Sequence, residues 1–156
     1  MGSVLFAPQQ GILARSRKSK ANSRKINREN ILKILYRLGE DSDDFSRTRN
    51  NDEIRNWRNF NAANLEQGLK ELGNRQLIEL KGPDINLTAA GLLEAKRIVR
   101  LHRLWELYLT VKLRLPSDHV HQDAEAIEHV ITPELEELLI AELENPGKDP
   151  HNSIIP

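Results

Sequence analysis

Apolar side chains recur every three or four residues along most of this chain, and that spacing predicts helices rather than strands. The regularity breaks once, at the turn Gly82-Pro83-Asp84, where short apolar runs stand on both sides. Two such runs around a Gly-Pro turn favour a small hairpin. We therefore expect a mostly α protein that contains one two-stranded β element.

Three helices are expected before this turn, and each has its own start or stop signal. The first ends at a C-cap glycine, Gly39. The second is capped by Asn51 or Asp52, and Asn61 caps the third. Two short helices followed by a hairpin form the winged version of a helix-turn-helix. Residues 27–87 are therefore predicted to be a winged-helix-like domain.

Residues 88–156 are predicted to hold three more helices. Thr88 caps the longest helix of the chain, which runs to about Leu113. A second helix covers 118–131, and Thr132-Pro133 starts the third with an N-cap followed by a proline at the first helical position. This part is therefore expected to be an all-α three-helix domain.

Composition and charge exclude several classes of protein. The chain has no Cys, which rules out disulfide scaffolds, thiolate zinc sites and a Cys nucleophile. No stretch approaches the roughly 20 apolar residues of a membrane helix. No Gly-rich phosphate loop or activated nucleophile is present, so we expect neither enzyme activity nor a small-molecule substrate.

The formal net charge of zero combines a basic head with an acidic tail. Residues 1–30 carry seven Lys or Arg and one Glu, whereas residues 117–156 carry ten Asp or Glu and one Lys. Zero net charge is therefore a poor guide to the partners of this chain, because each end presents a strong charge of its own.

Residues 1–26 form a basic leader ahead of the first domain. The short apolar run Val4–Ala7 precedes the basic residues, which is the reverse of a signal peptide. Such an order is typical of the cytoplasmic exit from a membrane helix. A disordered solubilising arm or a nucleic-acid-binding arm has the same composition, and the residues alone leave all three open.

One stretch near the acidic end gathers side chains that bind metals. On a helix, Glu125, Glu128 and His129 stand at i, i+3 and i+4 and project from one face. His121 lies one turn earlier on the same face. Two carboxylates and an imidazole without a thiolate suit Mn²⁺, Fe²⁺ or Zn²⁺.

A second pair, His102 and Glu106, stands at i and i+4 on the helix that Thr88 begins. If this helix packs against residues 118–131, two imidazoles and several carboxylates face each other across the interface. The alternative is a solvated acidic helix with incidental histidines. The presence of both groups favours a metal site.

Three segments of the chain resemble the metal-binding and dimerisation domain of the diphtheria toxin repressor family, which includes the manganese transport regulators. They are Arg100–Glu106, His121–Val130 and Pro150–Pro156. The preceding helices and hairpin are similar to the winged-helix domain of that family. The resemblance implies a homodimer formed by the last three helices.

The resemblance also implies two metal sites. The implied ligands are Glu125, Glu128 and His129 for a primary site, with His102 serving it too, and His102, Glu106 and His121 for an ancillary site. Glu125 stands where the iron repressors have Cys and the manganese regulators have Glu, which favours manganese by ligand hardness. We expect Mn²⁺ or Fe²⁺ first, and Zn²⁺ after them.

The first helix departs from the family. Where the family supplies further ligands, this chain has Asn30 and Lys33, which are degenerate ligand positions. Asn30 can ligate weakly through its carbonyl, whereas the ammonium of Lys33 could replace the charge of the metal. Glu29 either pairs with Lys33 at the surface or becomes a ligand through a one-residue shift of the alignment.

The DNA-reading part departs as well. The expected recognition helix has no basic residue before Lys70, and Glu66 would repel phosphate. Asn61, Asn64 and Gln67 could read adenine edges, and Lys81 is the one cation of the wing. We expect weak DNA binding at most.

The leader resembles the segment that follows the last membrane helix of metal-type ABC transporter permeases. In residues 3–15 a Leu-Phe-Ala-Pro turn leads into basic residues, as in the cytoplasmic tails of those permeases, some of which carry a fused repressor-like domain. The resemblance implies a cytosolic domain at the inner face of a bacterial inner membrane, with the permease portion of the same chain as its partner.

These features together predict a non-enzymatic, metal-sensing regulatory domain that dimerises and modulates transport by a manganese/iron-type permease. The first alternative is a metal-dependent, DNA-binding transcriptional repressor. The second is a metal-free dimerisation module in which Lys33 replaces the metal.

Overall fold

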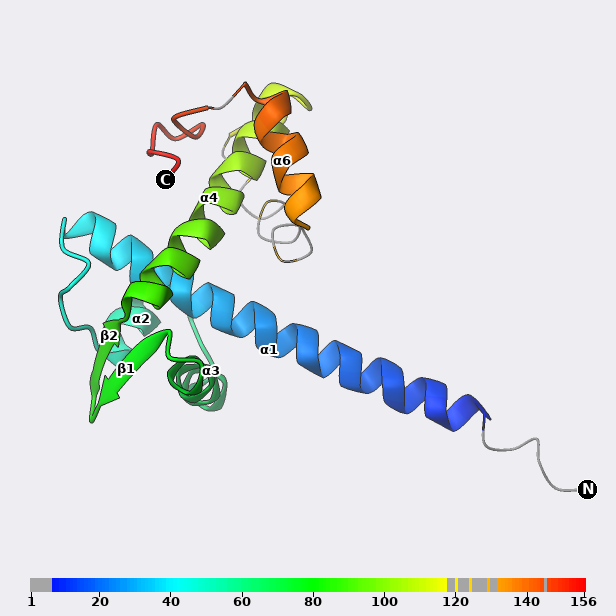
Figure 1. Ribbon diagram of the computed structural model, residues 1–156, viewed down its shortest axis with the longest axis vertical. Helices are drawn as coiled ribbons and strands as arrows, with labels where there is room; N and C mark the ends of the chain where they lie inside the picture. Colours follow the sequence, from blue (N-terminus) through cyan, green and yellow to red (C-terminus); the bar gives the residue numbers. More distant parts are fainter. Residues whose placement is uncertain (1–6, 118–119, 121–123, 125–128, 130–131, 145) are drawn as a thin grey trace, which may run out of the picture.

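Seven elements are described in the computed structural model, which covers residues 7–117, 120, 124, 129, 132–144 and 146–156, with side chains from residue 18 onward. In chain order they are α1 (Ala7–Asp41), α2 (Asn51–Trp57), α3 (Ala62–Asn74), β1 (Ile78–Lys81), β2 (Asp84–Leu87), α4 (Ala89–Val111) and α6 (Pro133–Glu142). Figure 1 shows α1 and α4 crossing, with the hairpin below the crossing and α6 beside the far end of α4. The expected mostly α fold with one hairpin is confirmed.

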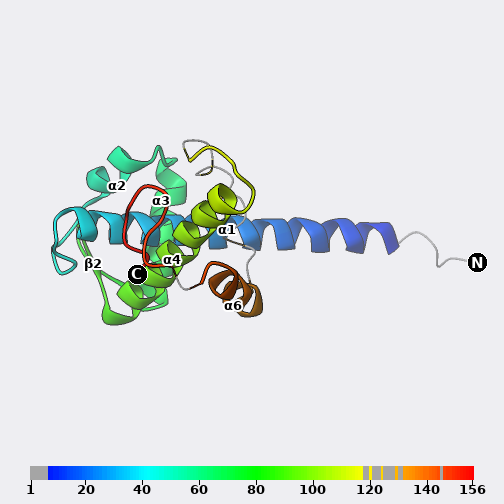
Figure 2. The ribbon, with the colours of Figure 1, turned by 90° about the horizontal axis from the view of Figure 1, so that it is seen from above.

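Helix α1 is 35 residues long and crosses the expected boundary at residue 26 without a break. Its first half projects from the body of the molecule in two perpendicular views (Figures 1 and 2). The prediction that the α4 region holds the longest helix is wrong, because α4 has 23 residues. Among the described residues, no helix is apolar over enough length to span a membrane.

Gly39 does not end α1, contrary to the expectation that it is a C-cap. The helix continues to Asp41, and a Cβ on Gly39 would lie 2.4 Å from Cδ1 of Phe45. The glycine therefore gives the Phe45 ring room to pack on the helix, and Phe45 in turn contacts Tyr36 at 5.0 Å between ring centroids.

The hydrophobic core of the winged-helix half is formed by apolar residues of α1 and of the elements packed around it. Its core contains Ile31, Leu32, Leu35, Ile54, Leu65, Leu69, Leu72, Ile78, Ile85, Ala95, Ile98 and Val99. The two strands pair antiparallel with Ile78 opposite Leu87 and Leu80 opposite Ile85. Arg49 adds a bridge to Ile85 from the loop before α2.

The helix starts follow the predicted capping residues with one shift. Asn61, Thr88 and Thr132 are N-caps as expected. Helix α2 is capped by Asn50 rather than by Asn51 or Asp52, and the Glu53 side chain accepts a hydrogen bond from the Asn50 main-chain N–H. That reciprocal capping box requires Glu at the third helical position, which places the cap one residue earlier.

The expected helix over 118–131 falls mostly outside the described residues. Val120 and Ala124 are helical and fully buried, and they pack with Leu109 and Trp105 of α4. Helix α6 begins at Pro133 as predicted and ends at Glu142. Helix α6 packs against α4.

Arg103 on α4 joins three parts of the fold. Its side chain is 4% exposed, and its guanidinium donates to both carboxylate oxygens of Glu40 on α1, at 2.8 and 2.6 Å. It also donates to the carbonyl oxygen of Ile154 at 2.5 Å and lies 3.6 Å from Oδ2 of Asp149. Burial alone would lower the pKa of Arg103, but hydrogen bonds and charge from Glu40 outweigh burial and raise that pKa.

Replacing Gly91 with alanine should destabilise the packing of α4 on the hairpin. The added Cβ would lie 1.7 Å from the carbonyl oxygen of Leu77, so backbone would have to move. We expect the free energy of unfolding in urea to fall by about 2–3 kcal/mol. Gly73→Ala is the control, because its Cβ would meet only the Leu80 side chain at 3.6 Å. Equal losses in both variants would contradict this interpretation.

Replacing Arg103 with methionine should destabilise the protein strongly, because the Asp149 carboxylate, whose side chain is also 4% exposed, would lose its ionic partner. Removing one member of a buried ion pair costs about 3–5 kcal/mol. Arg55→Met on α2 is the control, since the pair of Arg55 with Asp52 is exposed, and this substitution should change stability by less than about 1 kcal/mol. Urea unfolding measures the stability of both variants. A loss of stability below about 1 kcal/mol for Arg103→Met would contradict a stabilising role for the Arg103 contacts.

Candidate metal centre

The predicted ligands divide into two groups. His121, Glu125 and Glu128 lie outside the described residues. The other members of the predicted set are described, and all of them are buried: Asn30, Lys33, His102, Glu106 and His129. Five polar side chains in the interior need partners, because an unsatisfied buried polar group is strongly destabilising.

His129 is held by two side chains of α1. Its ring Nδ1 lies 2.5 Å from Oε2 of Glu29, and its main-chain carbonyl oxygen accepts a hydrogen bond of 2.8 Å from Nζ of Lys25. Lys25 and Glu29 are also 3.7 Å apart as an ion pair. The Glu29 side chain is 15% exposed, and it contacts the predicted ligand His129 as well as Lys25.

Asn30 carries a polar atom that suits a cation. The residue is buried, and its side-chain Oδ1 has no hydrogen-bond partner in the described part of the chain. A carbonyl oxygen with unused lone pairs in the interior is a fitting ligand for a hard divalent ion. Lys33, one turn later, is also buried and interacts with other groups of the protein. The polar side chains around Asn30 on α1 are therefore compatible with a bound metal.

The second described pair lies at the middle of α4. Nε2 of His102 is 3.2 Å from Oε1 of Glu106, and the two side chains are 0% and 2% exposed. The sequence spacing predicted that they share a face, and the structure brings them into direct contact. Both residues make further interactions as well.

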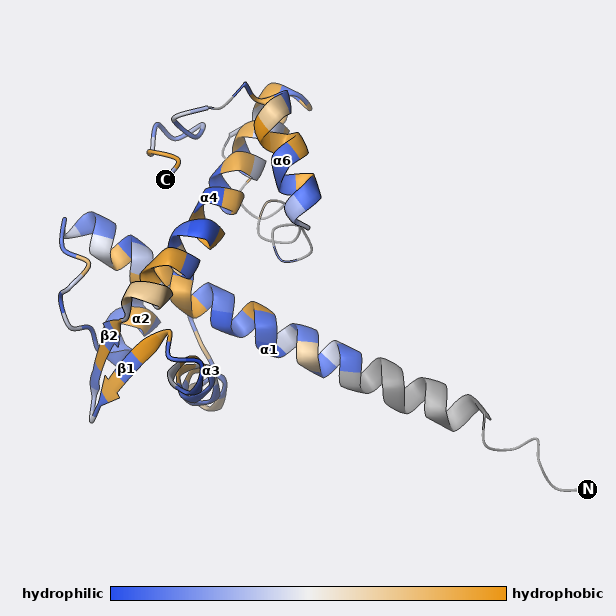
Figure 3. Cartoon of the chain, viewed as in Figure 1, coloured by the Kyte–Doolittle hydropathy of each residue, from blue (hydrophilic) through white to orange (hydrophobic). Residues whose placement is uncertain are grey.

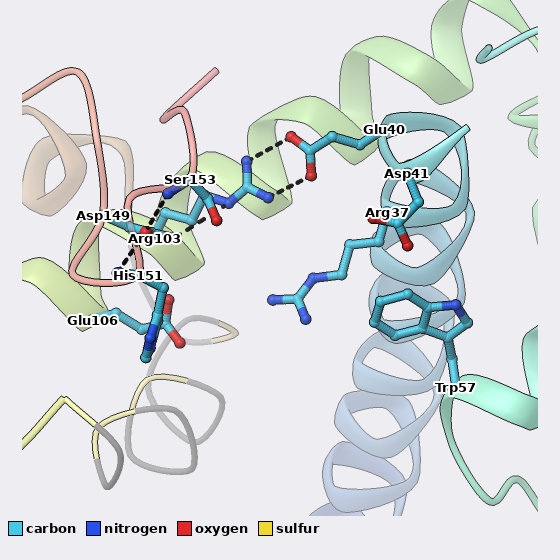
Figure 4. A pocket seen from close by; sticks show the side chains of 9 residues that line it. All are labelled: Arg37, Glu40, Asp41, Trp57, Arg103, Glu106, Asp149, His151 and Ser153. Atoms are coloured by element: carbon cyan, nitrogen blue, oxygen red, sulfur yellow. Dashed lines mark hydrogen bonds and ion pairs between the residues drawn. The ribbon is translucent and has the colours of Figure 1, made fainter. Parts of the chain in front are cut away.

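A pocket of about 260 Å³ opens beside Glu106, between the end of α1, α2, α4 and the C-terminal segment. Figure 4 shows its lining, which includes Arg37 against Trp57 on one side and the Arg103–Glu40 pair on another. His151 of the C-terminal segment lines the same pocket as Glu106. Sequence reasoning did not propose His151 as a site residue.

A turn around Asp149 places His151 in this pocket. Oδ1 of Asp149 accepts hydrogen bonds from the main-chain N–H groups of His151 and Ser153, at 2.9 and 2.8 Å. The sequence signal for it is the Asp-Pro-His triplet, because an Asp before Pro often starts such a side-chain-closed turn. Within the described residues, no three His, Asp or Glu side chains gather closely enough to hold a metal by themselves.

The predicted DNA-contacting residues are exposed, but most of them are engaged inside the chain. Asn61 accepts from the N–H of Ala63 as the α3 cap, and Gln67 donates to Glu71 at 3.0 Å. The main-chain oxygen of Asn64 accepts from Asn27, and Lys81 pairs with Glu79 at 3.3 Å.

Glu71 also draws basic residues of α1 onto α3. Arg28 donates to its carboxylate, and Arg24 lies 3.7 Å away. Burial alone would raise the pKa of Glu71, but these arginines and Gln67 lower it. Arg24 and Arg28 are therefore paired with an acidic residue within the protein rather than presented to phosphate.

Comparison with known proteins identifies two kinds of relative. Residues 88–156 match the family described as "Iron dependent repressor, metal binding and dimerisation domain". A "Probable metal transport system membrane protein" of Chlamydia trachomatis is 35% identical over 134 residues, which are 82% of this chain and 29% of that protein. The iron-dependent repressor IdeR of Mycobacterium leprae is 36% identical over 88 residues, 56% of this chain and 35% of that protein.

Among solved structures, the manganese regulator SloR superposes with a TM-score of 0.71 at 31% identity, covering 83% of this chain and 59% of SloR. The chain spans between about a third and about half of the length of the curated relatives that it matches. Both the matched domain and the matched fold agree with the order of elements seen here. Residues 88–156 are therefore identified with the metal binding and dimerisation domain of the iron-dependent repressor family.

Proposed function

We propose that this chain is a metal-sensing regulatory domain of a manganese/iron-type ABC transporter permease. The observation that carries the proposal is the burial of metal-type donors in the interior: Oδ1 of Asn30, which has no hydrogen-bond partner among the described residues, the ring of His129 and the His102–Glu106 pair. The match to a metal transport membrane protein over 82% of the chain supports the link to a permease.

The residues proposed to hold the metal come from three segments. His129, Glu125 and Glu128 form the proposed primary set, with Oδ1 of Asn30 as a further donor, and His102, Glu106 and His121 form the ancillary set. A bound Mn²⁺ or Fe²⁺, or Zn²⁺ after them, supplies positive charge that offsets these carboxylates. Such a charge favours the arrangement in which α1, α4 and residues 118–131 are close, which is a shift of population.

A homodimer is proposed from the apolar surface at the outer end of the molecule. Leu135 and Leu138 of α6 are exposed, as are Val111 and Leu113 at the end of α4. Figure 3 shows orange segments on α6 and at that end of α4. Leu135 and Leu138 are not covered within one chain; contact with a second copy would cover them.

The proposed location is the cytoplasmic face of a bacterial inner membrane. Helix α1 carries the basic leader, and residues 18–25 of it are exposed. Basic residues next to a membrane are attracted by anionic lipids and are typical of cytoplasmic segments. Metal binding to the domain would then change the activity of the attached permease.

A metal-dependent DNA-binding repressor is the second candidate. The likeness to SloR over 83% of the chain favours it, whereas the internal pairing of Lys81 and the acidic Glu66 and Glu71 on α3 disfavour it. A salt-sensitive, metal-dependent shift of palindromic promoter DNA would select this candidate over the transport regulator.

Metal binding is tested by calorimetric titration of the chelator-treated domain with Mn²⁺, and with Fe²⁺ under anaerobic conditions. We expect one or two sites per chain with micromolar dissociation constants, and loss of the primary site in Glu128→Ala and in His129→Ala. Glu137→Ala, at an exposed position of α6, is the control and should bind as the parent does. Binding no tighter than millimolar would leave the metal-free dimerisation module, with Lys33 in place of the metal, as the function.

The dimer surface is tested by Leu138→Glu, because Leu138 is 65% exposed in the single chain. We expect this substitution to convert a dimer into a monomer in sedimentation velocity, since a charge would be buried in an apolar interface. Leu93→Glu is the control: Leu93 is 71% exposed on α4, and its substitution should leave the mass unchanged. A monomeric parent protein, or a dimeric Leu138→Glu variant, would contradict the proposed interface.

A further inference from the structure

Two side chains of α1, one helical turn apart, contact the same residue, which lies 104 positions after one and 100 after the other. Lys25 reaches the main-chain oxygen of His129, and Glu29 reaches its ring. One contact fixes the backbone at residue 129 and the other fixes the imidazole. Neither Lys25 nor Glu29 belongs to the two ligand sets that the family resemblance implies.

The chemistry of the ring contact determines which nitrogen can bind a metal. An ionised carboxylate only accepts hydrogen bonds, so Nδ1 of His129 carries the proton that it donates to Glu29. In a neutral imidazole with its proton on Nδ1, the other nitrogen, Nε2, is the one that can coordinate a metal. A carboxylate behind a ligating imidazole sets its tautomer, orients its ring and increases its basicity.

We propose that Glu29 and Lys25 are positioning residues for the metal: Glu29 holds the ring of His129 through Nδ1, which makes Nε2 the nitrogen that would coordinate, and Lys25 anchors the main chain beneath it. This inference rests on the proposed metal-sensing function. It replaces both earlier interpretations of Glu29, because the carboxylate acts through His129 and not as a ligand or as a surface partner of Lys33.

The position of these two residues adds a consequence for the leader. Lys25 and Glu29 stand on the uninterrupted helix α1, just after the exposed residues 18–24. Because coupling between two events is reciprocal, metal bound through His129 must order this part of α1 if α1 orders His129. The leader is thus linked to the metal site by side-chain contacts and continuous helical backbone.

The test measures Mn²⁺ affinity by calorimetry and thermal unfolding in chelator for five chains: the parent, Glu29→Ala, Glu29→Gln, Lys25→Met and the control Lys20→Met. Lys20 is exposed on the same helix. We expect Glu29→Ala to weaken Mn²⁺ binding by about 10- to 100-fold, and Glu29→Gln to restore part of it, because an amide can still accept from Nδ1. Lys25→Met should weaken binding less, and Lys20→Met should leave it unchanged.

Stability in chelator separates positioning from a merely structural role. Positioning predicts weaker metal binding with a nearly unchanged unfolding temperature of the metal-free protein. A fall in that temperature with unchanged affinity would overturn the proposal. If Glu29→Ala does not fold, Glu29→Gln and Lys25→Met decide the question by the same criteria.

Hydrogen exchange of the α1 amides provides the second readout. In the parent, Mn²⁺ should slow exchange over residues 18–26 by about 5-fold or more, and this effect should shrink in Lys25→Met. A parent that binds Mn²⁺ without slowing, or variants that bind as the parent does, would overturn the positioning role while metal sensing stands. A parent that binds no Mn²⁺ would overturn both proposals, and it is recognised before any variant is made.

Discussion

The structure depends on one stretch of α1 that is buried on every side. Residues 30–36 are all buried, although a surface helix normally buries only one stripe. Such a segment must be enclosed, and here α2, α3 and α4 surround it. Since the enclosed stretch contains Asn30 and Lys33 as well as aliphatic residues, the apolar core and the proposed metal centre share one helix.

The enclosure explains why polar contacts elsewhere are so specific. Arg103 on α4 donates to Glu40 near the C-terminal end of α1. His129 contacts Glu29, which directly precedes the buried stretch of α1. Each contact removes a charge from water and stabilises the fold only when its partner is correctly placed. The two halves of the chain are therefore joined at defined points along α1, where a bound charge could favour one arrangement of the halves over another.

Much of the fold was predictable because its signals are local. The caps Asn61, Thr88 and Thr132 and the turn at Gly82-Pro83 were read correctly. The helical conformation of the leader was not predictable, because residues 7–26 have no periodic apolar stripe that would indicate a packed helix. Gly39 was misread for a related reason: its role depends on Phe45, whose packing no local rule contains.

The candidate site likewise combines contacts that local spacing predicts with contacts that depend on tertiary packing. The i, i+4 spacing predicted the contact of His102 with Glu106, whereas the contact between Glu29 and His129 joins residues 100 positions apart and follows from packing alone. His151 was missed because it lies in a turn and not on a helical face. The roles of His121, Glu125 and Glu128 remain predictions from the sequence.

The length of α1 has a geometric consequence. At 1.5 Å per residue, its 35 residues make a rod of about 50 Å, and a rod transmits orientation as well as distance, which a flexible linker does not. Adding or removing one residue ahead of Lys25 would rotate everything before it by about 100° around the helix axis. In a symmetric pair of such chains, the two rods would leave the domains at a fixed angle and spacing, so the register of the leader is itself a structural parameter.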